Sequence, residues 1–306
     1  MSIETANLNK NSESSFKNAL SKGKFVITCE IGPPKGAEDV EIRNTAEILR
    51  GLADGVNVTD LQSSVMRLGS LTTCHILKEM GLDPIYQVTC RDRNRLALQS
   101  DIISAYVLGI RNILALTGDY TTTGDHPQAE PVFDLDSVQL LYTIKRLEEG
   151  YDLSGKELTE KPSFFKGAVV NPGANTEAAL ELQFMKMQKK IEMGAQFFQT
   201  QAIFDVDVFK KFMERVSKLN IKVPILAGII LLKSEKMANY MNKFVPGVFV
   251  PDAIIKRMAD TDDKVSMCIE IATELINQVK PYCAGVHIQA LGWEKHIPTV
   301  IKNIAL

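Results

Sequence analysis

Short apolar runs alternate with amphipathic segments along the whole chain, and this alternation limits the possible folds more than any other feature. Each run is rich in β-branched and aromatic residues, with Gly, Pro or Asn at its borders. The runs occupy residues 25–30, 55–60, 84–89, 112–117, 165–170, 196–201, 223–228 and 285–290. Runs of this length and composition are typical of buried parallel strands.

The segments between the runs have the periodicity of helices. Apolar residues recur at i, i+4, i+7 and i+11 over residues 180–191, and a similar apolar face spans residues 209–219. The first of these segments predicts a helix over residues 178–193, with Asn175 as its N-terminal cap and Gly194 after its end. One extra short helix is expected within residues 246–263.

Eight strands separated by helices predict a parallel sheet, and eight is the number that closes into a (β/α)8 TIM barrel. The rival fold is a doubly wound sheet, in which a glycine-rich turn follows the first strand. The sequence contains no G-x-G-x-x-G, and Pro33 and Pro34 after the first run offer no amide hydrogens to a pyrophosphate. We therefore expect an α/β protein: a polar N-terminal extension (residues 1–15) and a single-domain barrel (residues 16–306).

Composition argues against several classes of partner. The 35 basic and 37 acidic residues are spread along the chain, so no nucleic-acid surface is expected. The N-terminus is polar, and no apolar run approaches the ~18 residues that span a bilayer, so we expect a cytoplasmic protein without a membrane segment. The five cysteines are widely spaced without C-x-x-C, which favours buried thiols over a metal or iron–sulfur site made by this chain alone.

Polar side chains gather at the ends of the predicted strands. Active-site groups of a barrel enzyme lie at the carboxyl ends of its strands and in the loops that follow. The residues at those ends are Glu30, Thr59, Asp60, Gln87, Thr89, Thr117, Gly118, Asp119, Asn171, Thr200 and Gln201. Their position predicts a small-molecule site at one mouth of the barrel.

Two carboxylates in this set have the chemistry of a reacting group. Glu30 ends a strongly apolar strand, and partial burial there favours its protonated form, which can donate a proton to a substrate nitrogen. Asp119 follows a glycine in a loop and is expected to be ionised. A salt bridge or a helix cap at a strand end would account for either residue equally simply.

The remaining titratable residues give weaker signals. The four histidines are far apart in the predicted elements, which does not favour a catalytic triad or a metal site. Three lysines form a basic face on the predicted helix over residues 178–193: Lys186, Lys189 and Lys190. This face is either solvated or a phosphate-binding surface.

The strand-end sequences resemble those of the methylenetetrahydrofolate reductases, flavin-dependent barrel enzymes of one-carbon metabolism. The resemblance covers roughly residues 15–305 and involves motifs in the same order as in that family. The matching segments are C-E-I-G-P-P at 29–34 (family F-E-x-x-P-P), V-N-V-T at 56–59 (V-x-V-T), Q-V-T-C-R-D at 87–92 (H-L-T-C-x-D), L-A-L-T-G-D at 114–119 (L-A-L-R/T-G-D) and T-Q-A-I-F-D at 200–205 (T-Q-x-x-F-D).

The resemblance implies reduction of 5,10-methylenetetrahydrofolate to 5-methyltetrahydrofolate, as in methionine biosynthesis. Glu30 falls on the general acid, which protonates the bridging nitrogen so that the ring opens to an iminium, and reduced flavin supplies the hydride. Asp119 falls on a carboxylate near both pterin and flavin, and Gln201 on a residue that binds the folate. The implied cofactor, FAD or alternatively FMN, would contact Thr59, Gln87, Thr117, Gly118, Asp119, Asp134, Asn171 and Lys190.

Several positions depart from the family pattern. Gln87 stands in place of a histidine, and the other replaced positions are Asn171, Asn175, Gln183, Met241 and Trp293. These departures leave open whether FAD or FMN is bound and whether NADH or NADPH donates electrons directly.

Residues 124–136 resemble a branch found in anaerobes with a folate carbon-fixation pathway, the Wood–Ljungdahl pathway. In that branch the reductase works beside an iron–sulfur partner subunit, so electrons that arrive only through such a partner are one alternative. A flavin-free pterin-binding methyltransferase barrel and a non-catalytic scaffold subunit are the others. An oligomer is expected in any case.

Overall fold

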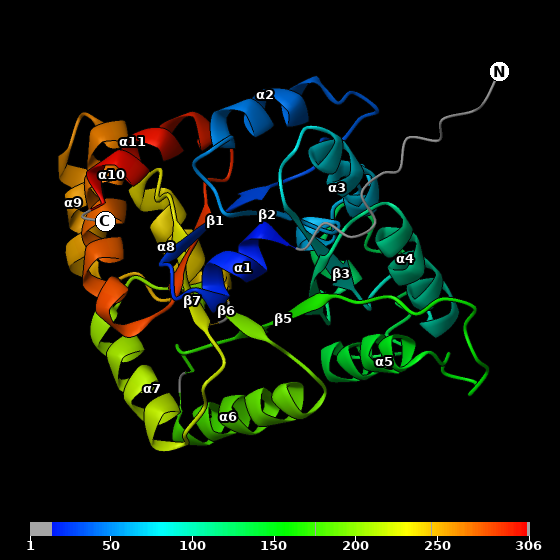
Figure 1. Ribbon diagram of the computed structural model, residues 1–306. Helices are drawn as coiled ribbons and strands as arrows, with labels where there is room; N and C mark the ends of the chain where they lie inside the picture. Colours follow the sequence, from blue (N-terminus) through cyan, green and yellow to red (C-terminus); the bar gives the residue numbers. More distant parts are fainter. Residues whose placement is uncertain (1–13, 175, 246, 305–306) are drawn as a thin grey trace.

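The computed structural model describes residues 14–174, 176–245 and 247–304, which form a closed barrel of eight parallel strands (Figure 1). Each strand pairs with its neighbours in sequence, and the first pairs with the last. The strands are β1 (Val26–Ile31), β2 (Gly55–Val58), β3 (Pro84–Thr89), β4 (Asn112–Leu116), β5 (Phe165–Val170), β6 (Phe197–Ala202), β7 (Ile225–Ile230) and β8 (Gly285–Gln289). The predicted TIM barrel is confirmed, and each predicted strand lies within two residues of its observed ends.

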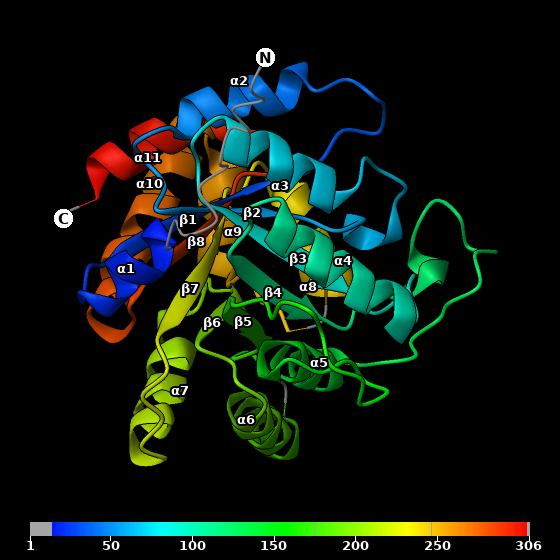
Figure 2. The ribbon, with the colours of Figure 1, turned by 45° about the vertical axis from the view of Figure 1, so that its right-hand side comes forward.

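Helices form an outer layer around the strands, as Figures 1 and 2 show. The helices are α1 (Ser15–Ser21), α2 (Val40–Leu49), α3 (Ser70–Glu79), α4 (Arg95–Val107), α5 (Ser137–Glu149), α6 (Glu177–Glu192), α7 (Val206–Lys218), α8 (Glu235–Phe244), α9 (Asp252–Asp260), α10 (Lys264–Val279) and α11 (Ile297–Asn303). Short 3-10 turns lie at Gln62–Ser64, Thr121–Thr123, Lys280–Tyr282 and Glu294–His296. The extra helix expected within residues 246–263 is α9.

The start of α6 differs slightly from the expectation. The helix spans Glu177–Glu192, and the hydroxyl of Thr176 accepts a hydrogen bond from the Ala179 amide at 3.1 Å. Thr176 therefore caps this helix, because a short side-chain oxygen just before the first turn satisfies an amide that the helix leaves free. The cap predicted at Asn175 lies outside the described residues.

An aromatic cluster closes the amino-terminal end of the barrel. Phe16 on α1 is fully buried, and its ring lies 5.2 Å from that of Phe197 and 5.6 Å from that of Phe165. The Asp83 carboxylate holds α1 in place by accepting hydrogen bonds from the Ser14 hydroxyl at 2.8 Å and the Phe16 amide at 2.9 Å. Side chains therefore fill this end, and the polar strand ends lie at the other one.

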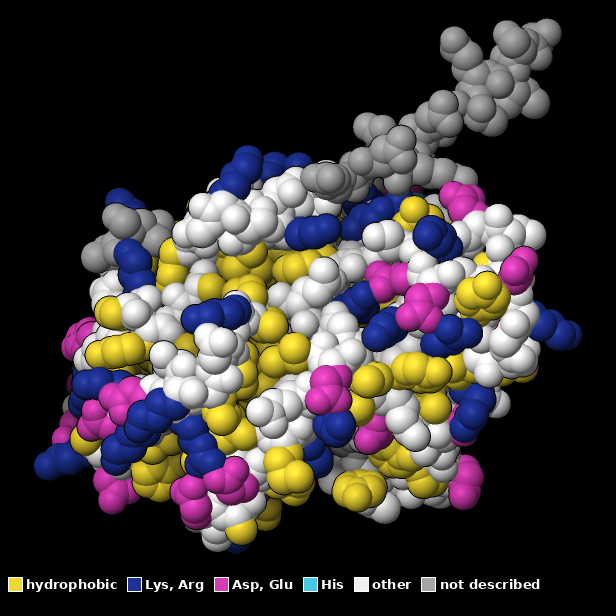
Figure 3. All heavy atoms as spheres, turned by 60° about the horizontal axis from the view of Figure 1, so that its bottom comes forward, with side chains coloured by type: hydrophobic (Ala, Val, Ile, Leu, Met, Phe, Trp, Pro, Cys, Tyr) yellow, Lys and Arg dark blue, Asp and Glu magenta, His cyan; other side chains and the backbone are white. Residues whose placement is uncertain are grey.

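Charged side chains of both signs are interspersed on the face seen in Figure 3. Within the described ranges, no helix is long and apolar enough to cross a membrane. The five cysteines are free thiols, and burial raises the pKa of Cys90 to about 12. The described part of the chain contains no group of three or more His, Cys, Asp or Glu side chains placed to hold a metal ion.

Candidate active site

A cavity of about 290 Å³ lies at the carboxyl ends of the strands; we call it the main cavity. Most of the strand-end residues that the sequence singled out line it: Glu30, Thr59, Asp60, Gln87, Thr89, Thr117, Gly118, Asp119, Thr200 and Gln201. Side chains from most of the strands thus meet in one space, as expected from the common direction of parallel strands.

Glu30 lies inside this cavity with only 6% of its surface exposed. The Gln62 side-chain amide donates a hydrogen bond to Oε1 at 3.3 Å, and the Gln289 amide donates to Oε2 at 3.4 Å. Nε2 of His287 lies 3.5 Å from Oε2. Two amides and an imidazole therefore surround the carboxyl group, instead of the lysine or arginine of a structural salt bridge.

A chain of buried polar groups continues from His287 into the barrel interior. Nδ1 of His287 lies 3.0 Å from the Thr28 hydroxyl, which accepts a hydrogen bond from the Gln199 amide at 3.4 Å. Gln199 in turn exchanges two hydrogen bonds with Asn57, at 2.9 and 3.0 Å. The Thr28 hydroxyl donates to the Val286 carbonyl at 3.4 Å, so this polar network joins β1, β2, β6 and β8 inside the barrel.

Sequence reasoning missed His287 as a partner of Glu30. The available signal was the alternation along β8, where Val286 and Ile288 are apolar while His287 and Gln289 are polar. Alternate residues of a barrel strand point inward, so this pattern places both polar side chains inside the barrel.

Asp119 lies exposed at the rim of the main cavity, on the loop after β4. The preceding Gly118 has a φ of +98°, and a Cβ there would lie 3.0 Å from the Arg91 Cβ and 3.2 Å from the Thr89 Cβ. Glycine is required here for conformation and space together. The loop therefore passes tightly over β3 and carries Asp119 to the cavity.

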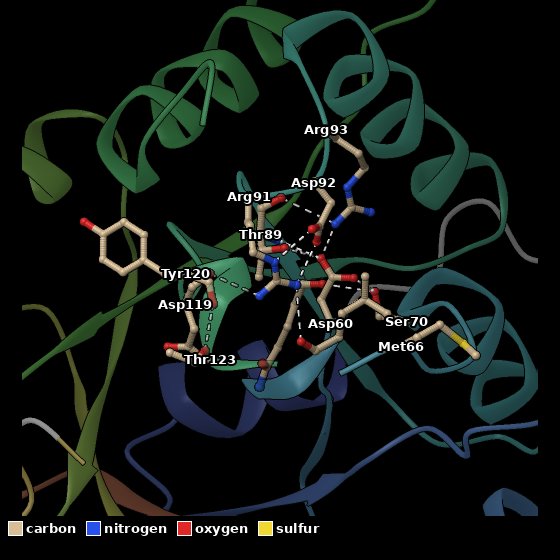
Figure 4. A network of polar contacts seen from close by, with 12 residues as sticks. Asp60, Met66, Ser70, Thr89, Arg91, Asp92, Arg93, Asp119, Tyr120 and Thr123 are labelled. Carbon is tan, nitrogen blue, oxygen red and sulfur yellow. Dashed lines mark hydrogen bonds and ion pairs between the residues drawn. The ribbon is translucent and has the colours of Figure 1, made fainter. Parts of the chain in front are cut away.

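Asp60 lines the same cavity but is fully engaged in a structural network (Figure 4). Its carboxylate accepts hydrogen bonds from the Thr89 amide and hydroxyl, both at 2.9 Å, and pairs with Arg93. The Ser70 hydroxyl donates to the other oxygen at 3.2 Å. Asp60 thus joins β2 to β3.

Thr59, at the end of β2, carries a buried polar atom without a partner among the described residues. Its hydroxyl oxygen is buried and has no hydrogen-bond partner among the described residues. An unpaired buried hydroxyl costs about 1–3 kcal/mol, so such groups are usually satisfied in the functional state. Thr59 is also one of the residues that line the main cavity.

A second cavity of about 380 Å³ adjoins the main one through Thr117 and Gly118. Two aromatic side chains line it, Tyr120 and Phe133, with ring centroids 5.8 Å apart. Asp136 lines it too and caps α5.

Lys190 lines neither cavity, but it lies within electrostatic range of Asp136 and contacts Val169, which lines the main cavity. Its ammonium donates a hydrogen bond to the Val169 carbonyl at 2.7 Å. Burial and the neighbouring charge of Lys186 lower the pKa of Lys190 from 10.5 to about 8, and Asp136 partly opposes this shift. An anion close to Lys190 would relieve the repulsion and favour the charged form.

Two other predicted cofactor residues lie outside the lining of both cavities. Asp134 pairs with Arg95 at 2.8 Å, at the start of α4. The Asn171 side chain accepts from the Gly173 amide at 2.9 Å and packs against Gly247 so closely that a Cβ there would overlap it. In this structure both residues fix the loops that surround the mouth.

The family described as methylenetetrahydrofolate reductase matches residues 15–305. Methylenetetrahydrofolate reductase (NADH) 1 of Arabidopsis thaliana is 23% identical over 304 residues, which cover 95% of this chain and 50% of that protein. The 5,10-methylenetetrahydrofolate reductase of Pectobacterium carotovorum is 27% identical over 232 residues, 74% of this chain and 72% of that one.

A solved structure has the same fold. It is an uncharacterized protein from Clostridium thermocellum that binds two copies of 5-methyl-5,6,7,8-tetrahydrofolic acid, with a TM-score of 0.66 and 18% identity, covering 95% of this chain and 97% of that one. The chain spans about half the length of the Arabidopsis relative. Since the family matches almost the whole sequence, and its motifs converge on one cavity, the chain belongs to the methylenetetrahydrofolate reductase family.

Proposed function

We propose that this chain catalyses the flavin-dependent reduction of 5,10-methylenetetrahydrofolate to 5-methyltetrahydrofolate. The observation that carries the proposal is the position of Glu30, a buried carboxyl group at the mouth of the barrel between amide and imidazole partners. Membership of the family supports the reaction. The Clostridium thermocellum protein, which binds a methylated tetrahydrofolate, supports a folate derivative as the ligand of this barrel.

In this reaction Glu30 donates its proton to the bridging nitrogen of the substrate, and the five-membered ring opens to an iminium. Asp119, exposed at the cavity rim, stabilises that positive charge, and Gln201 binds the folate by hydrogen bonds. The side-chain amides of Gln62 and Gln289 then stabilise the carboxylate that Glu30 has become, by donating hydrogen bonds to its two oxygens. Reduced flavin, when bound, supplies the hydride.

The residues present fit a flavin. Thr59 and Gly118 line the main cavity, and the buried Thr59 hydroxyl has no hydrogen-bond partner among the described residues. Gln87 and Thr117 line the same wall. These residues would hold the ring system.

The second cavity favours FAD over FMN. Tyr120 and Phe133 offer aromatic faces on which an adenine can stack, and Lys190 offers a positive charge to the phosphates. Asp134 and Asn171 would then act indirectly, by fixing the surrounding loops.

For the source of electrons we propose NADH or NADPH, with an iron–sulfur partner subunit as the alternative. Large apolar side chains are exposed on loops that follow β2, β4 and β7, namely Met66, Tyr120, Val132 and Phe249, and on α8, namely Tyr240 and Phe244. They would suit a docked protein. We place the protein in the cytoplasm, as an oligomer, in methionine biosynthesis or in folate-dependent carbon fixation.

The decisive test is Glu30→Gln in the full chain, with Glu79→Gln as the control. Glu79 is exposed on α3 beside His75, away from the mouth. The purified protein is expected to be yellow. Glu30→Gln should keep reduction of the flavin by the donor but lose folate turnover by roughly 10²–10⁴-fold, while the control keeps both.

Two results would contradict the proposal. Loss of both half-reactions in Glu30→Gln would show that Glu30 does not act as the acid. A colourless protein that cannot be reconstituted with FAD or FMN would favour the flavin-free methyltransferase or the scaffold instead.

A further inference from the structure

Arg91, the residue directly after Thr89 and Cys90 at the end of β3, has an unusual environment for an arginine. Only 1% of its surface is exposed, and it is the largest fully buried side chain among the described residues. It also lines the main cavity. Charged side chains are rarely buried to this extent unless their donors are used, so the partners of Arg91 reveal what it does.

The Arg91 guanidinium pairs with a neighbouring carboxylate and also contacts two loops. Nε and Nη2 donate to the Asp92 carboxylate at 2.8 and 2.7 Å. Nη2 also donates to the Leu61 carbonyl at 3.2 Å, and Nη1 lies 3.5 Å from the Asp119 carbonyl. Figure 4 shows Arg91 between Asp92 and Asp119. Asp92 therefore balances the charge, and the other donors link the loop after β2 to the loop after β4.

These two loops determine where both carboxyl groups lie. Asp119 itself belongs to the loop after β4. Gln62, which donates to Glu30 at 3.3 Å, follows Leu61 directly in the loop after β2. Leu61 has a φ of +48°, a left-handed conformation that costs energy for a leucine and needs support from its surroundings.

The backbone of Arg91 also contacts the loop after β4. Its carbonyl accepts a hydrogen bond from the Val132 amide at 2.8 Å, where the long loop after β4 returns toward α5. Its Cβ lies close to Gly118, where an added Cβ would be only 3.0 Å away. The side chain, the carbonyl and the Cβ of Arg91 thus all contact loops around the mouth of the barrel.

We propose that Arg91 is a positioning residue: it holds the loops after β2 and β4 together and thereby sets the placement of Glu30 and Asp119 across the main cavity. This inference rests on the proposed function for its catalytic consequence. The motif T-C-x-D leaves this position open, so the resemblance assigns no role to it.

Arginine suits this task better than lysine. Its planar group has five N–H donors, enough to bind a carboxylate on one edge and two carbonyls on the others. A lysine ammonium can bind Asp92 but cannot span both carbonyls. A displacement of about 1 Å at a reacting group can cost roughly 10²-fold in rate.

The test compares Arg91→Met and Arg91→Lys with the control Arg111→Met. Arg111 is also a buried arginine and donates to the Tyr106 carbonyl at 2.8 Å, but it precedes β4 at the opposite end of the barrel. Hydrogen exchange of the amides in residues 61–66 and 118–124 reads the loops directly and needs no substrate. Steady-state kinetics with 5,10-methylenetetrahydrofolate gives kcat and KM.

We expect Arg91→Met to raise amide exchange in both loops by roughly tenfold or more, and Arg91→Lys to raise it less. Folate turnover should fall by roughly 10²-fold, chiefly in kcat, and Arg91→Lys should recover part of it. Arg111→Met should lower the Tm but change neither the amide exchange of the two loops nor the folate turnover. If Arg91→Met does not fold, the comparison between Arg91→Lys and Arg111→Met decides the question.

Two outcomes would overturn the inference. Unchanged exchange in the two loops would show that Arg91 does not join them. Faster exchange with kcat within twofold of the wild type would show that the contacts of Arg91 with the two loops do not position the carboxyl groups. If the wild type itself does not turn over the folate, the proposed function fails, and the affinity for 5-methyltetrahydrofolate then replaces kcat: an affinity unchanged by Arg91→Met overturns the positioning role.

Discussion

Lys190→Met should make the ligand-free protein more stable at pH 7. The Lys190 ammonium is largely buried, and burial together with the charge of Lys186 lowers its pKa from 10.5 to about 8. A shift of this size corresponds to about 3 kcal/mol by which the fold disfavours the charged form. The hydrogen bond to the Val169 carbonyl, at 2.7 Å, offsets part of this penalty. We therefore expect a gain of about 1–2 kcal/mol in the free energy of unfolding.

The pH dependence of the stability difference shows whether the buried charge of Lys190 causes it. Below pH 8 the lysine is charged in both states, so the wild type bears the whole penalty. Between about pH 8 and 10.5 the unfolded state binds more protons than the folded one, and the stability of the wild type rises relative to the variant. The advantage of Lys190→Met should therefore be full at pH 7, shrink as pH rises through 8, and reverse before pH 10.5, because the wild type regains about 3 kcal/mol over this range.

Urea unfolding at pH 7 and pH 10 measures this difference, and Lys189→Met is the matched control. Lys189 is adjacent on the same helix, but its side chain is 66% exposed and pairs with Glu192. A Lys190→Met protein that is less stable at pH 7, or whose advantage persists unchanged at pH 10, would refute the reasoning. Under the FAD proposal the same variant should also bind inorganic pyrophosphate more weakly than the wild type.

Two further substitutions test the packing. Phe16→Ala should lower the free energy of unfolding by about 3–5 kcal/mol, since it empties the closed end of the barrel; a loss below about 1 kcal/mol in urea unfolding would contradict this. Tyr86→Phe should keep or raise the Tm, because the buried Tyr86 hydroxyl has no partner in the described part of the chain and its removal ends a desolvation cost of about 1–3 kcal/mol. A clear fall in Tm would mean that a bound water or ligand satisfies that hydroxyl.

The sequence predicted the barrel well because its strands are buried on both faces. Residues 84–89 and 165–170 are continuous apolar runs with few polar interruptions, and both coincide with observed strands. The same argument placed Glu30 and Asp119 at one mouth, since parallel strands end on the same side.

Side-chain partners were harder to predict, because they depend on register and loop path. His287 meets Glu30 only because β8 closes on β1, with residues far apart in the sequence. Arg91 contacts two other loops, which no local pattern indicates. The sequence also did not indicate that the Lys190 ammonium binds the Val169 carbonyl or that the Asn171 side chain packs against Gly247.

The polar chain inside the barrel has a consequence for how the sheet closes. Thr28 and His287 are register partners across the seam between the first and last strands, and Asn57 and Gln199 face each other across the interior. A slip of one residue at the seam would turn these side chains outward and leave buried donors unpaired. Only the correctly closed barrel satisfies them, and only that barrel sets an imidazole beside Glu30. The surroundings of Glu30 thus depend on closure: a chain that closes wrongly loses both the buried hydrogen bonds and the partners of this carboxyl group.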